Sequence, residues 1–286
     1  MPAFDAKGIS LYFEEKGVGE PVVFVHGTLC DWAVWQSLAG ALSQKFRTVA
    51  YSRRYAHPNT RAGDLTDSTV QNNAEDLDAL IDGMGAGKVH LIGHSYGGFI
   101  SAFFAVRHPE KLRSLTLVNA AVATMLVRKP GAAASLSLLL RSPSVALSAN
   151  KLLKATDATV KSVQGGDQAA AYRVFLPALL DDRNDLPPKP GDFEQMVTRN
   201  ARTVRETTTP FPEITAKEMR TVMVPALVVW GELSAPWDYR VSQSLAQSIP
   251  GSEREIIPGA GHFCFLERPS DVSARILEFL MKHPSG

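Results

Sequence analysis

A serine lies between two glycines in the run LIGHSYGGFI, residues 91–100, at the spacing G-x-S-x-G. The run follows a short apolar segment typical of a strand and precedes one typical of a helix. In that context the pattern forms a strained strand-to-helix turn that exposes the serine oxygen. Gly93 and Gly97 keep side chains out of so tight a turn, and the positive end of the helix would favour an oxyanion beside Ser95. The pattern therefore predicts Ser95 as a nucleophile, against the alternative of an ordinary glycine-rich turn.

A serine nucleophile needs a general base, and histidine most often fills that role. His262 lies in IPGAGHFCFLERP, a glycine-flanked loop between the last predicted strand and the last predicted helix. Such a loop lies at the carboxyl edge of a sheet, where it can face the serine turn, so we predict His262 as the base. His57 stays open between lining a pocket and forming a turn before Pro58. His94 is expected to pack beside the serine turn, and His90 to be buried in its strand. His108 is expected at the surface and His283 in the tail.

Backbone N–H groups stabilise the oxyanion of a tetrahedral intermediate. One donor is expected from Tyr96, the residue after the serine, and the second from the loop HGTLCDW, which ends an earlier strand. In that loop we predict the N–H of Thr28, with that of Leu29 as second choice; the alternative is a plain strand-ending turn. Leu29, Trp32 and Phe263 flank these motifs and are predicted to contact the substrate.

Three motifs together carry a family resemblance. HGTLCDWAVW, GHSYGGF and IPGAGHFCFLERP resemble the α/β-hydrolase superfamily, and most of all its esterases, lactonases and carbon–carbon bond hydrolases with a helical cap. The resemblance covers nearly the whole chain outside a central helical stretch. It implies an α/β fold with an eight-stranded, mostly parallel sheet and a Ser–acid–His triad. It leaves the substrate open, because this fold supports many reactions.

The acid departs from the pattern that the resemblance implies. Similar proteins carry Asp in a strand-ending G-x-x-D, where this chain has Gly-Glu-Leu-Ser and ends on Ser234. A second location used by some relatives is Asn119, which is not an acid either. Asp238 lies one helical turn beyond Ser234. We predict it as the triad acid, and an N-cap of the next helix is an equal alternative; Glu232 and Asn119 follow.

Short apolar strands alternate with helical patterns, which predicts a parallel sheet covered on both faces. Two segments, 1–121 and 222–286, are expected to form this core, and 122–221 a helical cap or lid. The expected strands are 9–14, 21–25, 47–51, 89–92, 112–118, 226–230 and 253–257. The expected core helices are 31–44, 68–84, 98–107, 241–249 and 272–281, and 185–193 (DLPPKPGDF) is read as a loop.

The predicted cap is rich in apolar side chains, most of which are expected to pack against the core while some face the substrate. These are Leu126, Leu136, Leu138, Leu139, Leu140, Leu147, Leu152, Leu153, Phe175, Leu176, Leu179 and Leu180. They indicate a substrate with a hydrophobic acyl or aryl group. Arg53 and Arg54 could bind a carboxylate, but a surface position is expected.

The composition of the chain narrows the expected classes of partner and of cellular location. The 286 residues are 45% hydrophobic, with 30 basic and 29 acidic side chains spread along the chain, so neither nucleic acid nor a membrane is an expected partner. No secretion signal or continuous apolar span is evident, and two isolated cysteines, Cys30 and Cys264, are expected as free thiols of a cytoplasmic protein. No metal or organic cofactor is expected, and the oligomeric state cannot be read.

The leading hypothesis is a serine hydrolase that cleaves a carboxylic ester or lactone through an acyl-enzyme on Ser95. One alternative is a carbon–carbon bond hydrolase or lyase that uses Ser95 and His262 without the acyl-enzyme. The other is a non-enzymatic ligand receptor on the same scaffold.

Overall fold

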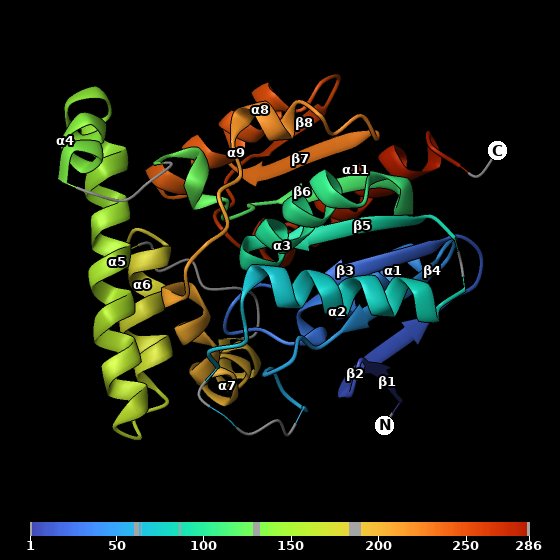
Figure 1. Ribbon diagram of the computed structural model, residues 1–286, viewed down its shortest axis with the longest axis horizontal. Coiled ribbons are helices and arrows are strands. Elements are labelled where there is room, and N and C mark those ends of the chain that lie inside the picture. The colour runs from blue at the N-terminus through green and yellow to red at the C-terminus, as the bar shows by residue number, and fades with distance from the viewer. Residues whose placement is uncertain are drawn as a thin grey trace.

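Eight strands form one sheet in the order β1-β2-β4-β3-β5-β6-β7-β8 (Figure 1). The computed structural model describes residues 2–59, 63, 65–85, 87–127, 132–182 and 190–284. The strands are β1 (Ala3–Ala6), β2 (Ile9–Lys16), β3 (Pro21–Val25), β4 (Arg47–Tyr51), β5 (Val89–His94), β6 (Leu112–Val118), β7 (Ala226–Gly231) and β8 (Glu253–Ile257). From β4 to β8 every neighbouring pair is parallel, whereas β1 and β2 pair antiparallel at one edge. The predicted α/β fold with a mostly parallel sheet is confirmed.

The central strands are apolar because helices cover both faces of the sheet. All residues of β3, β5 and β7 are buried. The helices α2 (Val70–Gly83), α3 (Ser95–Arg107), α8 (Ala216–Met219) and α9 (Pro236–Ser248) cover one face, and α1 (Gln36–Leu42) and α11 (Pro269–Met281) cover the other (Figure 1). Two short helices, η2 (Pro109–Lys111) and α10 (Cys264–Glu267), lie in connections, and η1 (Trp32–Trp35) leads into α1.

Three element boundaries differ from the prediction in ways that matter for the site. Strand β1 has only four residues and no apolar alternation, so its sequence carried too little signal. Helix α3 begins at Ser95 itself. Helix α9 begins at Pro236, five residues before the predicted start, because proline suits the first position of a helix, where its missing N–H removes no bond.

Most of the described chain between β6 and β7 is helical and lies beyond the carboxyl ends of the strands, with the long helix α5 farthest out, whereas its last helix, α8, returns to the face of the sheet (Figure 1). We call it the insertion. Its elements are η3 (Ala123–Met125), α4 (Ala132–Arg141), α5 (Pro143–Gln164), η4 (Ala171–Phe175), α6 (Leu176–Leu179), α7 (Pro190–Arg199), η5 (Ala201–Thr208) and α8. Residues 183–189 of the predicted loop lie outside the described residues, and helix α7 already begins at its Pro190, which corrects that end of the loop.

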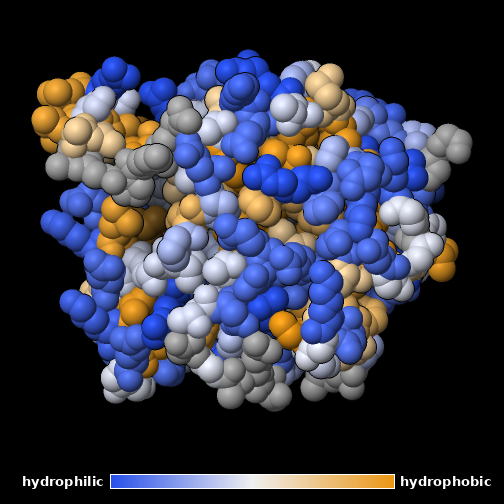
Figure 2. Space-filling view, viewed as in Figure 1, coloured by the Kyte–Doolittle hydropathy of each residue, from blue (hydrophilic) through white to orange (hydrophobic). Residues whose placement is uncertain are grey.

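Two groups of apolar side chains in the insertion behave differently. Phe175, Leu176, Leu179 and Leu180 are buried as predicted. Five leucines expected to pack against the core instead face solvent along α4 and α5: Leu136, Leu139, Leu140, Leu147 and Leu153 (Figure 2). Helix α4 contacts mainly α5, so a sequence pattern could not tell which of its faces is covered. No helix in the described part of the chain is both long and apolar enough to cross a membrane.

Candidate active site

Ser95 lies at the turn from β5 into α3 and has a backbone φ of 54°. This left-handed conformation is costly for a residue with a side chain, and such strain is concentrated at functional sites. A Cβ on Gly97 would collide with the backbone oxygens of Val25 and His26, so only glycine fits there. Ser95 is partly exposed, whereas the residues on either side of it are buried. The predicted turn is therefore present, and the serine is its solvent-accessible residue.

His262 is paired with a buried carboxylate. Its Nδ1 lies 2.8 Å from Oδ2 of Asp238, and both side chains are essentially inaccessible to solvent. Because a carboxylate only accepts, the imidazole donates from Nδ1 and leaves Nε2 with a free lone pair. Nε2 is buried without a hydrogen-bond partner among the described residues. A base of this form can take a proton from a nearby hydroxyl.

Asp238 is at the third position of α9 and does not cap that helix, whose N-cap is Ala235. The capping alternative is therefore wrong. Asn119, which follows β6, donates from Nδ2 to Oδ2 of Asp238 and to Oγ of Ser234, both at 2.8 Å. The two positions where the family resemblance places the acid, Ser234 and Asn119, thus hold neutral residues, and Asn119 bonds both Ser234 and the Asp238 carboxylate. Asn119 has a φ of 43°, which asparagine tolerates better than most residues.

A path of hydrogen bonds connects the serine turn to the histidine and the acid. His94 Nε2 donates to the backbone oxygen of His262 at 3.0 Å, and the two rings lie 4.9 Å apart. On the other side, the N–H of Ala121 donates to the backbone oxygen of Ser95 at 2.9 Å. Ala121 lies two residues after Asn119, whose amide donates to Asp238, so hydrogen bonds and short backbone segments together link Ser95 to the His262–Asp238 pair. Burial, and then the charge of His262, hold the pKa of His94 well below its usual range, which keeps His94 neutral.

Two glutamates hold the loop that carries His262. Glu267 accepts from the N–H of Gly261 at 2.8 Å and of Phe263 at 3.2 Å, one on each side of the histidine. Glu232, a candidate for the acid, instead accepts from the N–H of Gly259 at 3.0 Å and is exposed. Sequence reasoning did not single out Glu267, because its bonds to the N–H groups of Gly261 and Phe263 do not follow the spacing of a capping box.

The loop after β3 lies directly against the serine. A Cβ on Gly27 would stand 2.8 Å from Cβ of Ser95. Thr28 is the next residue along the chain. The N–H of Leu29 donates to Oγ1 of Thr203 at 2.9 Å, so it is not available to an oxyanion. Tyr96 is the second residue of α3, so the helix itself offers no acceptor for its N–H. The first-choice donors, Thr28 and Tyr96, therefore remain the better candidates.

The predicted substrate contacts divide into two groups. The ring of Phe263 lies 5.2 Å from that of His262 and 5.0 Å from that of Phe193 on α7, so it reaches both the site and the insertion. The ring of Trp32 lies 5.3 Å from that of Tyr12 of β2 at an angle of 55°, and the Leu29 side chain is buried. Phe263 is therefore the predicted substrate contact that lies beside a triad candidate.

The expected surface position of Arg53 and Arg54 is wrong. Arg53 is fully buried and donates to Glu206 of η5 at 2.7 Å. Arg54 is buried against Asp76 and also donates to Asp67. Their charge is matched inside the protein, because each comes directly after a buried strand and the paired carboxylates lie on neighbouring elements. Neither arginine is placed as a free carboxylate receptor at the surface.

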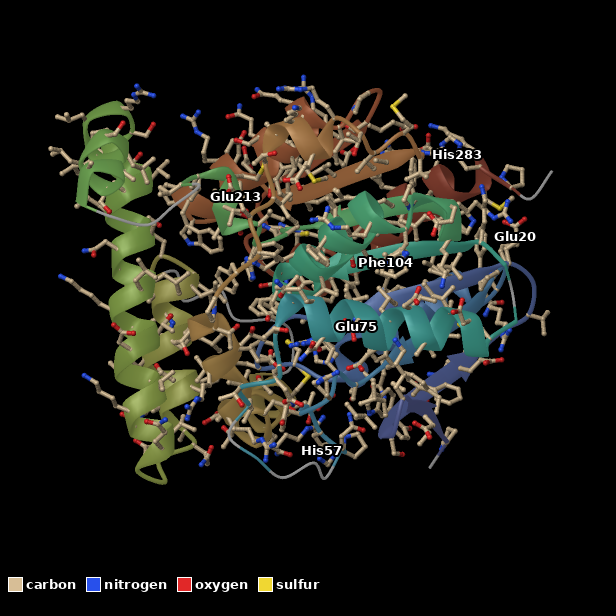
Figure 3. The ribbon with its side chains drawn as sticks, in the orientation of Figure 1. Glu20, His57, Glu75, Phe104, Glu213 and His283 are labelled. Carbon is tan, nitrogen blue, oxygen red and sulfur yellow. The ribbon has the colours of Figure 1, made fainter. Side chains whose placement is uncertain are left out.

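The other histidines lie outside this cluster. His90 is buried as predicted and its ring bonds Ser114 and Glu20. His57 is exposed, on a turn before Pro58, at the lower edge of Figure 3, and His283 lies at the end of the sheet away from α5. His108 is partly exposed on the connection after α3. Cys30 and Cys264 are free, and burial raises the pKa of both thiols.

Within the described ranges, no three His, Cys, Asp or Glu side chains are grouped so as to hold a metal ion. The candidate catalytic side chains are one Ser, one His and one Asp, with an Asn bonded to the Asp. That set suits acyl transfer, in which a hydroxyl attacks a carbonyl and an imidazole moves the proton.

Comparisons with known proteins support the same family. A family model described as alpha/beta hydrolase fold matches residues 20–269. A protein named as an uncharacterised carboxylesterase of Bacillus subtilis is 26% identical over 271 residues, covering 91% of this chain and 78% of that protein. A cis-3-alkyl-4-alkyloxetan-2-one decarboxylase of Shewanella oneidensis is 23% identical over 285 residues, covering 96% and 86%.

Solved structures show the same fold. An esterase from Thermogutta terrifontis superposes with a TM-score of 0.70 at 22% identity, covering 99% of this chain and 97% of that one. The enzyme Est816, described as degrading N-acyl homoserine lactones, superposes with a TM-score of 0.68 at 19% identity, covering 97% and 100%.

Proposed function

The chain belongs to the α/β-hydrolase fold family, and on this premise we propose that it is a serine hydrolase of carboxylic esters or lactones. In this proposal Ser95 is the nucleophile, His262 the general base and acid, and Asp238 the residue that orients the imidazole. The acyl or aryl group of the substrate is hydrophobic. The relatives named as esterase, lactone-degrading enzyme and oxetanone decarboxylase act on substrates within or next to this class.

One observation carries the proposal: a buried His262–Asp238 pair at 2.8 Å, on the same hydrogen-bonded path as a strained serine. An unpaired buried polar atom is costly, so an open ring nitrogen on a histidine that a carboxylate already orients favours a role in proton transfer. Here Nε2 has no partner among the described residues. A ligand receptor would not need that free nitrogen, so an enzyme is the better account.

In acylation, His262 Nε2 removes the proton of Ser95 Oγ as the oxygen attacks the carbonyl carbon. Asp238 stabilises the imidazolium that forms, and Asn119 holds the carboxylate oxygen that faces the ring. The N–H groups of Tyr96 and Thr28 donate to the oxyanion, with the positive end of α3 behind them. Collapse of the intermediate then transfers the proton from His262 to the departing alcohol oxygen.

In deacylation, a water molecule takes the place of the alcohol and gives its proton to His262. The hydroxide oxygen attacks the acyl carbon, the same N–H groups receive the oxyanion, and Ser95 leaves with the proton returned by His262. For a lactone the alcohol stays joined to the acyl chain throughout, and this second step releases the hydroxy acid from Ser95.

We assign residues 122–221 to a cap over this site. Phe193 of α7 meets Phe263 beside His262, and Phe211 lies 5.2 Å from the ring of Phe99 on α3. These aromatic side chains reach from the insertion to the serine end of the sheet, and they support a hydrophobic substrate.

The test is a substrate panel with the purified wild-type protein. It contains p-nitrophenyl esters of increasing chain length together with four-, five- and six-membered alkyl lactones, and it includes stopped-flow measurement of the first turnover. We expect ester and lactone hydrolysis with a chain-length optimum, and a burst of p-nitrophenol equal to the enzyme concentration when deacylation is slower. Absence of turnover on every substrate by a folded protein would overturn the proposal.

The four-membered lactone also tests the alternative lyase reaction. If the protein releases carbon dioxide and an alkene from it and leaves the p-nitrophenyl esters intact, the reaction is decarboxylation. Ring opening to the hydroxy acid supports hydrolysis.

A further inference from the structure

Three buried polar side chains of the insertion lie on one face of the 3₁₀ helix η5. Asn200, its N-cap, and Thr203 and Glu206 within it are all fully buried. A 3₁₀ helix has three residues per turn, so side chains three apart stack directly above one another. Eight residues is long for such a helix, and the spacing explains its use here: only a period of three aligns these positions.

This polar face meets the loops that follow β3 and β4. Asn200 donates to Asp31 at 2.8 Å and accepts from the N–H of His57 at 2.7 Å. Thr203 accepts from the N–H of Leu29 at 2.9 Å and donates to the backbone oxygen of Asn200 at 2.8 Å. Its hydroxyl therefore uses both its donor and its acceptor.

Glu206 acts on the same loop through Arg53. The guanidinium donates to Glu206 at 2.7 Å, to the backbone oxygen of His26 at 3.0 Å and to that of Gly27 at 3.3 Å. His26 accepts from the N–H of Arg53 at Nε2 and donates from Nδ1 to the oxygen of Gly27 at 2.8 Å. Burial, and then the charge of Arg53, hold the pKa of His26 well below its usual range, in agreement with this neutral tautomer.

These contacts determine how the peptide between Gly27 and Thr28 is turned. Two donors hold the Gly27 oxygen on one side. In a planar trans peptide the C=O and the following N–H point in opposite directions, so the N–H of Thr28 is turned away from Arg53. Because Gly27 lies against Ser95, that N–H is held at the serine end of the loop.

We infer that η5 is the positioning element of the oxyanion hole, with Thr203 and Glu206 fixing the loop that presents the N–H of Thr28. Thr203 occupies the N–H of Leu29, and this leaves Thr28 as the donor. The insertion thus supplies part of the catalytic geometry and does more than cover the substrate. This inference rests on the proposed serine hydrolysis.

The test compares Thr203→Val with wild type on a p-nitrophenyl ester. Valine has the shape of threonine but can neither accept from Leu29 nor donate to Asn200. We expect kcat to fall about tenfold with KM nearly unchanged, less than the 10²–10³ that follows loss of a whole oxyanion donor. Inhibition by an alkyl trifluoromethyl ketone, whose hemiketal oxygen occupies the hole, should weaken by a similar factor. Inhibition by the matching trifluoromethyl alcohol, which forms no oxyanion, should not change.

Thr208→Val is the matched control, because the Thr208 hydroxyl also donates to a backbone oxygen three residues earlier but lies exposed on η5, away from the loop. It should leave kcat and both inhibition constants at their wild-type values. Thr203→Ser keeps the hydroxyl and should restore kcat. Where Thr203→Val does not fold, the comparison of Thr203→Ala with Thr203→Ser gives the same test.

Equal ketone inhibition in wild type and Thr203→Val would overturn the inference. So would a loss of activity in which ketone and alcohol inhibition weaken together, since that pattern reports general damage to the site. A wild type that neither cleaves the ester nor binds the ketone would instead overturn the proposed function.

Discussion

At the residue scale, the main departure from the family pattern is the position of Asp238, the residue proposed as the acid. Asp238 lies four residues beyond the strand-ending position used by similar proteins, which Ser234 occupies. The carboxylate nevertheless reaches His262 at 2.8 Å because α9 begins at Pro236 and turns its first side chains toward the histidine loop. Asn119 supplies a second hydrogen bond to the same oxygen. A carboxylate can therefore move along the sequence while its place beside the imidazole is kept.

Asp238→Asn should lower kcat by about 10²–10⁴, as for the acid of other triads, because the amide cannot stabilise an imidazolium and can favour the wrong tautomer. KM should change little. The measurement is steady-state kinetics on a p-nitrophenyl ester. Asp271→Asn is the matched control: Asp271 also occupies the third position of a helix that begins with proline, but it is exposed on α11. Full activity of Asp238→Asn would remove Asp238 from the mechanism.

The turn at Ser95 and the loop that carries His262 could be predicted because each lies in a motif whose spacing is local. The sequence alone does not distinguish a triad acid from a helix cap at Asp238, because the difference depends on a contact across 24 residues and on where α9 begins. Arg53 was misplaced for the same reason: its partner, Glu206, is 153 residues away in the insertion. A local sequence pattern cannot predict an ion pair of this kind, because it depends on how two distant elements pack against each other.

At the element scale, the serine turn is set by close contact between backbones. A Cβ at Gly97 would collide with the backbone of Val25 in β3, so the start of α3 and the end of β3 can approach only with glycine at this position. Strands were the best predicted elements, because burial on both faces gives unbroken apolar runs. Strand β1 and the 3₁₀ helix η5 were not predicted, since the first is very short and the second is held mainly by tertiary hydrogen bonds.

Gly97→Ala should lower the free energy of unfolding by roughly 2 kcal/mol or more, the range of an overpacked core, and should also reduce activity by moving Ser95. Gly40→Ala in α1 is the contrasting variant, because a Cβ there meets nothing within 4 Å. It should raise stability by about 0.5–1 kcal/mol. Urea unfolding measures whether Gly97→Ala is less stable, and Gly40→Ala more stable, than wild type. Equal stability of Gly97→Ala and wild type would contradict the described contact.

At the scale of the whole molecule, burial lowers the pKa of three histidines: His26, His90 and His94. Burial is the first cause in each case, and it lowers the pKa of His90 to about 4 from an ordinary 6.5. Between these values the unfolded chain binds a proton at this position that the folded protein does not. Stability is therefore fully present above about pH 6.5 and is lost as the pH falls toward 4.

His90→Gln removes this titration and keeps a polar side chain between Ser114 and Glu20. The free energy of unfolding of wild type should fall more steeply from pH 7 to pH 4 than that of the variant, by on the order of 2 kcal/mol. Urea unfolding at a series of pH values measures both slopes. Parallel curves for the two proteins would contradict a neutral buried His90.

The sequence predicted the α/β architecture and the helical stretch after the sixth strand, because alternating strand and helix patterns specify layers. It did not predict that η5 would bond to the loops after β3 and β4 or that five leucines of α4 and α5 would face solvent. The bonds of η5 and the exposure of the leucines both depend on how the insertion packs against the core, which involves contacts between segments distant in sequence.

The most direct test of the central claim is the intact mass of the protein after treatment with an alkyl fluorophosphonate, measured for wild type and Ser95→Ala. A fluorophosphonate reacts with a serine that a neighbouring base has activated. We predict a single phosphonyl adduct on wild type and none on Ser95→Ala, with peptide mapping that places the adduct on Ser95. A folded wild type that stays unmodified, or a Ser95→Ala variant that is modified to the same extent, would contradict the assignment of Ser95 as the nucleophile.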